Sequence, residues 1–234
     1  MKIRCVWEHN GNDSLLYAGN FIGAYTRGAS PEEAKSKMRE EVRRFQLWKG
    51  EAVIDDLDIE IVQEKASGLQ IRDADSDVLF TTEEAPLTMD EYRDLKAIAM
   101  KSAEDFFVLY SAFPDKTKSA NPIRETFYGA VPRTAEEMYL HTKNVNAYYF
   151  AEIGIVADNE GTIVSCRERG FDALEHSQDF LSPGVRKGSY DELWSVRKVL
   201  RRFIWHDRIH AKAMYRMGVK TFGADVIPDV FGFR

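Results

Sequence analysis

The sequence is poor in cysteine, with only Cys5 and Cys166 among its 234 residues. The two lie far apart and form no Cys-x-x-Cys pair, which excludes a disulfide framework and a cysteine-rich zinc site. This cysteine usage is typical of a reducing compartment. The chain is 44% hydrophobic and 30% charged, which is the composition of a globular protein that folds without stabilising disulfides or a structural zinc ion.

Long apolar runs are also missing. No stretch of about 18 uncharged apolar residues occurs, so we expect no transmembrane helix and no membrane partner. The first ten residues, MKIRCVWEHN, carry charges where a secretory signal peptide needs an apolar segment. Together with the cysteine content, these absences predict a cytoplasmic protein.

The chain has no excess of basic charge. Its net charge is −6, and the acidic excess lies in residues 1–87, which hold 11 Lys and Arg against 17 Asp and Glu. An acidic segment repels a phosphate backbone and no basic stripe offsets it, so we expect no nucleic-acid partner. We interpret the acidic residues as a solvated surface.

Residues 1–85 combine strand periodicity with one helix. Alternation of apolar and polar residues predicts strands over residues 2–8, 15–25 and 53–62, and a short strand-like piece lies in residues 68–80. The helix begins after Ser30, with Pro31 at its first position and Glu33 completing a capping box, and it ends at Gly50. Its apolar face is predicted to contain Ala34, Met38, Val42 and Phe45.

The run LLYAGNFIGAYTRGASPEEAKSKM, residues 15–38, resembles the small HicB-like domain. The resemblance covers about 65 residues and implies an α+β module of ββαβ type over residues 1–85. HicB antitoxins usually add a DNA-binding tail that is not visible here, so the resemblance suggests a docking or dimerising module. A sheet this small leaves an edge strand to cover, and we therefore expect a homodimer. We expect this module to supply no metal ligand or catalytic group.

After Thr88 the periodicity changes to about 3.5 residues, as in packed helices. Helices are predicted over residues 88–113, 134–152, 162–181 and 189–217. Thr88, Thr134 and Ser189 are the expected N-terminal caps of the first, second and fourth helices. Residues 86–234 are thus expected to form an all-α four-helix bundle, which we expect to fold without the preceding module.

Histidines interrupt two of the predicted core stripes. On the last helix the stripe is Val196, Val199, Phe203, His206, His210, Ala213 and Met217. On the second helix His141 stands in phase with Met138, Val145 and Tyr148. Burying unpaired imidazoles costs free energy, about 1–3 kcal/mol for each unsatisfied nitrogen. A divalent metal satisfies all three rings, with His206 and His210 on one helical face and His141 facing them. The two other histidines, His9 and His176, are not expected to be ligands.

The segments TAEEMYLHTKNVNAYYF (residues 134–150) and WSVRKVLRRFIWHDRIHAKAMYRM (residues 194–217) resemble the second and last helices of the DinB/YfiT superfamily. Its members are four-helix bundles that hold a divalent metal with one histidine from the second helix and an HxxxH pair from the last. The resemblance covers about 145 residues and implies His141, His206 and His210 as ligands. Many relatives follow the HxxxH with an Arg-Gly-Gln-like tail, whereas this chain has AKAM at residues 211–214.

The sequence HDRIH also matches the metalloprotease pattern HExxH with Asp207 in place of Glu. Aspartate is one methylene shorter and no downstream Glu ligand follows, which argues against such a protease. We expect Asp207 to accept a hydrogen bond from a metal-binding histidine or to pair with Arg208 or Arg202 at the surface. The basic residues of the last helix are interpreted as a solvated face, with one or two near the metal available for an anionic substrate. Two interpretations of the aromatic residues near this position stay open: they wall the pocket, or they belong to the core, as aromatic residues at helical spacing more often do. The residues are Trp205, Tyr139, Tyr149 and Tyr128.

Two functions remain open at this point. The first is a metal-dependent enzyme in which the ion activates a thiol or water, as a thiol S-transferase using a low-molecular-weight thiol or as a hydrolase-like enzyme on a small-molecule substrate. Zinc is the first choice of metal, because three imidazoles with one open position suit it, and nickel is the second. The second function is a non-catalytic binding or docking protein in which the metal only fastens the helices together.

Overall fold

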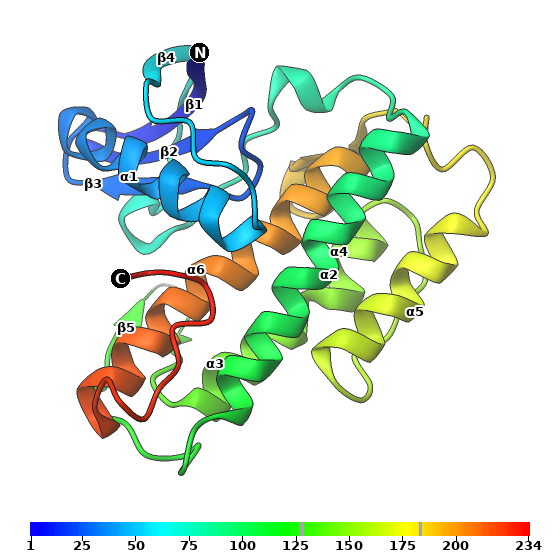
Figure 1. Cartoon of the computed structure of the whole chain (residues 1–234). Helices are drawn as coiled ribbons and strands as arrows, with labels where there is room; N and C mark the ends of the chain where they lie inside the picture. The colour runs from blue at the N-terminus through cyan, green and yellow to red at the C-terminus, as the bar shows by residue number, and fades with distance from the viewer. Residues whose placement is uncertain (127–128, 183) are drawn as a thin grey trace.

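The computed structural model describes residues 1–126, 129–182 and 184–234 and has an α+β architecture (Figure 1). Its sheet has four strands in the order β3-β2-β1-β4. The strands are β1 (Lys2–Asn10), β2 (Asp13–Ala18), β3 (Tyr25–Gly28) and β4 (Asp58–Ala66). Neighbours β1 and β2, and β2 and β3, are antiparallel, whereas β1 and β4 are parallel. The helix α1 (Pro31–Lys49) supplies the crossover that a parallel neighbour requires.

The strand predicted over residues 15–25 is wrong as a single element, because the chain turns back on itself within it. The turn is closed by a hydrogen bond from Ala18 N to Ala24 O of 3.0 Å. Gly23 in this turn has φ +114°, and a Cβ atom there would lie 2.4 Å from Ile204 Cγ2. The strand-like piece in residues 68–80 is also wrong, since it contains the 3₁₀ turn η1 (Ile71–Asp73) in place of a strand.

The N-cap Ser30 and the C-terminal Gly50 predicted for α1 are confirmed. The predicted capping box is not formed, because the Glu33 carboxylate accepts from Ala29 N in place of Ser30 N. Ser30 Oγ accepts a hydrogen bond from Glu33 N at 3.2 Å, and the Glu33 carboxylate accepts one from Ala29 N at 2.8 Å. At the other end Gly50 takes the left-handed conformation, with φ 75°. The predicted apolar face of Ala34, Met38, Val42 and Phe45 is buried.

In the described part of the chain five α-helices follow, with one short element before them and the others between them. The helices are α2 (Met89–Ser111), α3 (Ala135–Lys143), α4 (Val145–Glu152), α5 (Ile163–Glu175) and α6 (Val196–Phe222). The short elements are η2 (Thr81–Glu83), η3 (Ser189–Asp191), and the strand pairs β5 (Glu125–Thr126) with β6 (Gly129–Ala130) and β7 (Arg186–Lys187) with β8 (Leu193–Trp194). None of the helices in the described ranges is long and apolar enough to cross a membrane.

The helix predicted over residues 134–152 is divided into α3 and α4 at Asn144. The side chain of Asn159 explains the break, because its Oδ1 accepts from Ala147 N at 2.9 Å and its Nδ2 donates to Asn144 O at 3.0 Å. It thereby occupies the Ala147 N–H that would otherwise donate to the preceding helical turn. The caps at Thr88 and Thr134 are confirmed.

The start predicted for the last helix at Ser189 is wrong. Residues 189–194 form η3 and β8, with Tyr190 at φ 58°, and the helix begins after Ser195, whose Oγ accepts from Lys198 N at 3.2 Å. The helix also continues past Gly218, where the Phe113 ring packs so closely that a Cβ would lie 2.5 Å from Phe113 Cζ. It ends at Gly223.

α6 lies at the centre of the molecule, between the sheet with α1 and the other helices (Figure 1). Every residue from 198 to 208 is buried, so this part of the helix is covered on all sides. One core cluster joins side chains of both parts of the chain, including Phe45 and Trp48 of α1, Phe106 of α2 and Met214 of α6. The packing of the sheet against α6 therefore decides what one face of that helix contacts.

Candidate metal centre

Three histidines from two helices meet on one side of α6. His206 and His210 are one helical turn apart on α6, and His141 comes from α3, which packs against it. The potential ligand nitrogens of the three rings all lie within 4.8 Å of one another. The ring centroids are 5.3 Å apart for His141 and His206, 4.6 Å for His141 and His210, and 4.4 Å for His206 and His210. The structure therefore brings together the three residues that the sequence singled out.

The environment keeps these imidazoles neutral. His206 is 7% exposed and His210 is half-buried, whereas His141 lies at the surface. Burial holds the pKa of His206 well below its ordinary value, and the neighbouring His210 and His141 lower it further. Burial and His141 lower the pKa of His210 to about 3, and the neighbouring protein atoms that partly desolvate the His141 ring lower its pKa as well. Neutral imidazole is the protonation state in which histidine binds a metal.

One buried ring nitrogen in this cluster lacks a partner among the described residues. His206 Nδ1 is buried and makes no hydrogen bond within the described parts of the chain. Leaving a buried polar nitrogen unsatisfied is unfavourable by about 1–3 kcal/mol, so a ligand at this position is physically reasonable. A divalent ion fits the donor set, because three neutral imidazoles that converge within a few ångströms are typical ligands of zinc and related metals.

No carboxylate or thiolate of the described residues belongs to the same group of possible ligands. Both cysteines are free and buried elsewhere, Cys5 in β1 and Cys166 in α5. The protein thus offers three ligands to an ion at this position, which leaves coordination positions for water or a substrate.

Aromatic rings flank the buried side of the cluster. The Tyr149 ring lies 5.9 Å from the His206 ring, and the Trp205 ring lies 6.4 Å from it. Tyr139 lies differently from our expectation, because it stacks on Tyr110 at 4.0 Å and its hydroxyl accepts a hydrogen bond from Ile163 N. The expected wall residue Tyr128 lies outside the described residues.

Asp207 points away from the histidines, and the expectation that it pairs with Arg208 or Arg202 at the surface is wrong. It is fully buried, and its Oδ2 accepts from Ser102 Oγ of α2 at 2.6 Å and from Arg167 Nη1 of α5 at 3.0 Å. Neither hydrogen bond involves a histidine. One residue along a helix turns the side chain by about 100°, which directs Asp207 toward α2 and α5.

The interpretation of the basic residues of α6 as a solvated face is also wrong. Lys198, Arg201 and Arg208 are at most 2% exposed and Arg202 is 9% exposed. Their acidic partners are Glu192 at 2.8 Å from Lys198, Glu83 next to Arg201, and Glu41 at 2.8 Å from Arg208. Glu41 and Glu83 belong to the acidic first part of the chain. Part of the negative charge of residues 1–87 therefore lies in buried ion pairs and not on a solvated surface.

The two other histidines lie away from the cluster. His9 in β1 stacks on Trp7 with a centroid distance of 4.1 Å, and its Nε2 lies 3.1 Å from Glu64 Oε1. His176 follows the end of α5, and its Nδ1 lies 2.7 Å from Asp172 O.

Comparison with known proteins identifies no relative. No family model, no curated protein and no solved structure matches the chain. The function must therefore be argued from the chemistry of the residues that the structure brings together.

Proposed function

We propose that the protein is a metal-dependent enzyme that holds one divalent ion with His141, His206 and His210. The observation that carries this proposal is the convergence of their ligand nitrogens within 4.8 Å, with the buried His206 Nδ1 left without a hydrogen bond in the described structure. A buried polar nitrogen of this kind is normally satisfied, and a metal satisfies all three rings at once.

Three protein ligands favour catalysis over a purely structural role. Structural zinc sites are usually closed by four protein ligands, whereas catalytic sites keep a position open. When bound here, zinc or nickel would act as a Lewis acid that lowers the pKa of a water or of a low-molecular-weight thiol. These are the chemistries of a hydrolase-like enzyme and of a thiol S-transferase acting on a small-molecule substrate.

Side chains of this protein would prepare the site for such a reaction. Burial keeps His206 and His210 neutral, and Tyr149 and Trp205 exclude water from the inner side of His206. Arg202 lies one turn before His206 with its guanidinium 5.1 Å from the Trp205 ring, and its buried Nε has no hydrogen-bond partner among the described residues. We assign Arg202 no substrate group, because its Nη1 donates to Ser76 O at 2.7 Å and its Nη2 lies 3.9 Å from Glu192 in the interior.

The architecture supports the DinB/YfiT resemblance as part of this proposal. The HxxxH pair is on the last helix and the third histidine is on a helix packed against it, in the second of the four expected helical segments. We propose that residues 86–234 form a four-helix bundle of this type, in which α3 and α4 together make the second helix. Residues 1–85 are proposed to be a HicB-like module that docks or dimerises, with the order β1-β2-β3-α1-β4.

The alternative is a non-catalytic protein in which the ion only fastens α3 to α6. The same three histidines support it, because an ion bound to both helices stabilises the folded state by its binding free energy. A coordination position of the ion that holds exchangeable water distinguishes the two functions, since a purely structural site has no such position.

Metal analysis tests the first step. We expect wild-type protein purified without chelators to contain close to one zinc or nickel ion per chain. The His141→Ala variant, altered at a surface-exposed ligand, should fold and lose most of the ion, whereas the control His176→Ala should retain it. Addition of Co²⁺ to metal-free wild-type protein should produce the visible absorption of a nitrogen-coordinated ion, and its absence would refute the site even if His141→Ala failed to fold.

An activity screen then separates the two functions. Wild-type protein is assayed with a panel of low-molecular-weight thiols and electrophiles, and with ester and amide substrates. Turnover that is lost in His141→Ala and retained in His176→Ala supports the enzyme. Bound metal that raises the melting temperature but admits no exchangeable water, with no turnover, supports the fastening role.

A further inference from the structure

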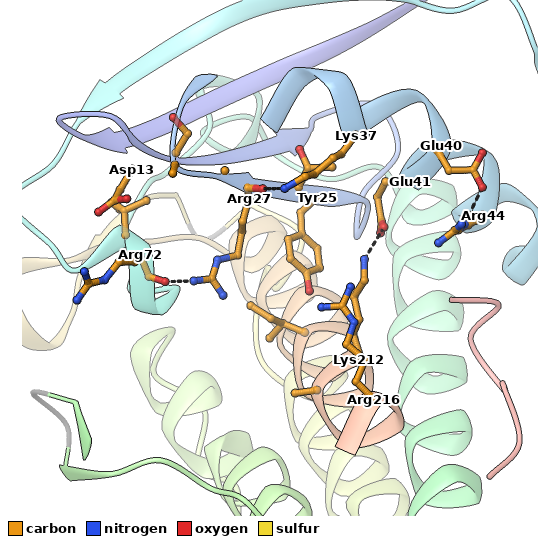
Figure 2. Close-up of a pocket in the computed structure, with 17 residues that line it drawn as sticks. Asp13, Tyr25, Arg27, Lys37, Glu40, Glu41, Arg44, Arg72, Lys212 and Arg216 are labelled. Atoms are coloured by element: carbon orange, nitrogen blue, oxygen red, sulfur yellow. Dashed lines mark hydrogen bonds and ion pairs between the residues drawn. The ribbon is translucent and has the colours of Figure 1, made fainter. Parts of the chain in front are cut away.

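A cavity of about 630 Å³ lies between the N-terminal sheet and α6, apart from the three histidines (Figure 2). Its walls come from β2, β3, α1 and η1 on one side and from residues of α6 on the other. None of the three histidines lines it. Its volume is within the range of sites that bind small molecules, which is about 300–1,000 Å³.

The lining is rich in positive charge. Its basic residues are Arg27, Lys37, Arg44, Arg72, Lys212 and Arg216. Three acidic residues, Asp13, Glu40 and Glu41, also line the cavity. Glu40 is paired with Arg44 at 2.7 Å, and Glu41 accepts from both Arg208 and Lys212. Lys37 is paired with Glu33. Ion pairs therefore neutralise Glu40 and Glu41, and within the described ranges they leave Arg27 and Arg216 without a carboxylate partner.

Arg27 and Arg216 are the two cations of the cavity that are best placed to bind an anionic ligand. Arg27 donates a hydrogen bond to the main-chain carbonyl of Arg72, and no ion pair of Arg27 or Arg216 occurs within the described ranges. Figure 2 shows Arg27 on one side of Tyr25, directed toward Arg72, and Arg216 on the other side. The two arginines therefore reach the cavity from β3 and from α6. An arginine that faces a cavity without a carboxylate can pair with two oxygens of a phosphate or carboxylate ligand.

Tyr25 supplies a hydroxyl group between the two arginines. The residue is 5% exposed, and charged groups surround its hydroxyl. Burial and Glu41 raise the pKa of this phenol, and the positive charges of Arg208, Arg27 and Arg216 oppose that shift. The phenol is therefore a neutral donor close to both arginines. Ile71, Ile209 and Ala213 add apolar surface to the same cavity.

We infer that this cavity binds a small anionic metabolite, held by Arg27, Arg216 and the Tyr25 hydroxyl through its phosphate or carboxylate groups. The apolar side chains would contact the remainder of the molecule. A single inorganic ion would fill only a small part of the space, so the ligand carries more than one functional group. The site requires both parts of the chain, because Arg27 and Tyr25 come from the sheet and Arg216 from α6.

Titration calorimetry with pyrophosphate and with tricarballylate, a tricarboxylate, tests this inference and distinguishes the two kinds of anion. We expect one of them to bind the wild-type chain in a one-to-one ratio and to raise its melting temperature. Arg216→Gln should weaken that binding by about tenfold, and Arg27→Gln/Arg216→Gln should abolish it. Tyr25→Phe should weaken it by a smaller factor while the fold is retained.

The matched control is Arg4→Gln, which removes the same charge from an exposed arginine of β1 outside the cavity. It should bind the anion like the wild type. Binding must also persist in His141→Ala, which separates this site from an ion held by the histidines. Equal affinity in wild type, Arg4→Gln and Arg216→Gln would overturn the inference, as would the absence of binding of both anions.

Discussion

Glu8 is a carboxyl group whose surroundings oppose its ionisation. It lies fully buried in β1, where it accepts hydrogen bonds from Ser76 Oγ and from Asp77 N. Burial is the largest influence and raises the pKa of Glu8 to about 7, and the nearby Asp77 carboxylate also raises it. Tyr17 of β2 and Arg202 of α6 face the same carboxyl group. The protonation state of Glu8 therefore sets the charge where the sheet contacts α6.

The raised pKa of Glu8 predicts how stability depends on pH. A carboxyl group with a pKa higher in the folded than in the unfolded chain contributes stability that is complete below the unfolded value of 4.5 and is lost as pH rises through about 7. Glu8→Gln stays neutral, so its free energy of unfolding relative to wild type should rise by about 3 kcal/mol between pH 4 and pH 8. Urea denaturation at both pH values measures this difference. A constant difference would show that Glu8 ionises normally.

Asp207 and the histidines of α6 show what the spacing of residues along one helix can predict and what it cannot. The spacing of four residues predicts that His206 and His210 share one face of α6, and they do lie together with His141. Asp207 is adjacent to His206 in sequence, but its partners Ser102 and Arg167 belong to α2 and α5. Spacing predicts the direction of a side chain from its own helix, whereas the identity of the neighbour in that direction depends on other elements.

At the scale of elements, three of the four predicted N-terminal caps were right, and Ser189 was the exception. Ser30, Thr88 and Thr134 cap helices as predicted, because a cap acts on backbone groups only two or three residues away. The break between α3 and α4 was not predicted, since the side chain that causes it, Asn159, lies beyond the end of α4. Helical periodicity continues across the break and does not reveal it.

Asn159 therefore predicts a measurable effect on these two helices. Asn159→Ala removes the hydrogen bonds to Ala147 N and Asn144 O, and we expect the free energy of unfolding to fall by about 1–2 kcal/mol. Urea denaturation of this variant is compared with that of Asn12→Ala, which alters an exposed turn asparagine and should change stability very little. Equal stability of the two variants would mean that Asn159 does not hold the break.

At the scale of the whole molecule, α6 joins the two parts of the chain through buried ion pairs. Arg201 pairs with Glu83 and Arg208 with Glu41, and Lys198 donates to Asp77 O at 2.8 Å. Removing one partner of a buried ion pair is strongly destabilising, by about 3–5 kcal/mol, because the other charge remains buried without compensation. The sheet and the helices thus depend on each other for the environment of α6.

This dependence leads to a prediction that differs from our expectation from sequence. A chain that begins at Pro86 lacks Glu41 and Glu83 and exposes apolar residues of α6, so we now expect it not to fold cooperatively. Circular dichroism during heating should show a broad, low-temperature loss of helix in place of the sharp transition of the full chain. A truncated chain that melts sharply within a few degrees of the full chain would show that residues 86–234 form an independent domain.

The sequence by itself determined the features that depend on local backbone chemistry and on side-chain phase along one element. These are the α+β composition, the capped helices α1 and α2, and the positions of His141, His206 and His210 on their helices. Each follows from interactions within a few residues or from the fixed geometry of a helix. They were sufficient to predict the candidate metal centre.

Only the tertiary structure decided what covers the second face of α6. A run of Lys and Arg on a helix is normally exposed, because burying a charge is unfavourable unless an opposite charge meets it. Here Glu41 and Glu83, more than 100 residues away in sequence, provide that charge and make burial possible. The same packing placed Arg27 and Tyr25 opposite Arg216 around one cavity. No local pattern contains this information, since it arises only when distant segments come into contact.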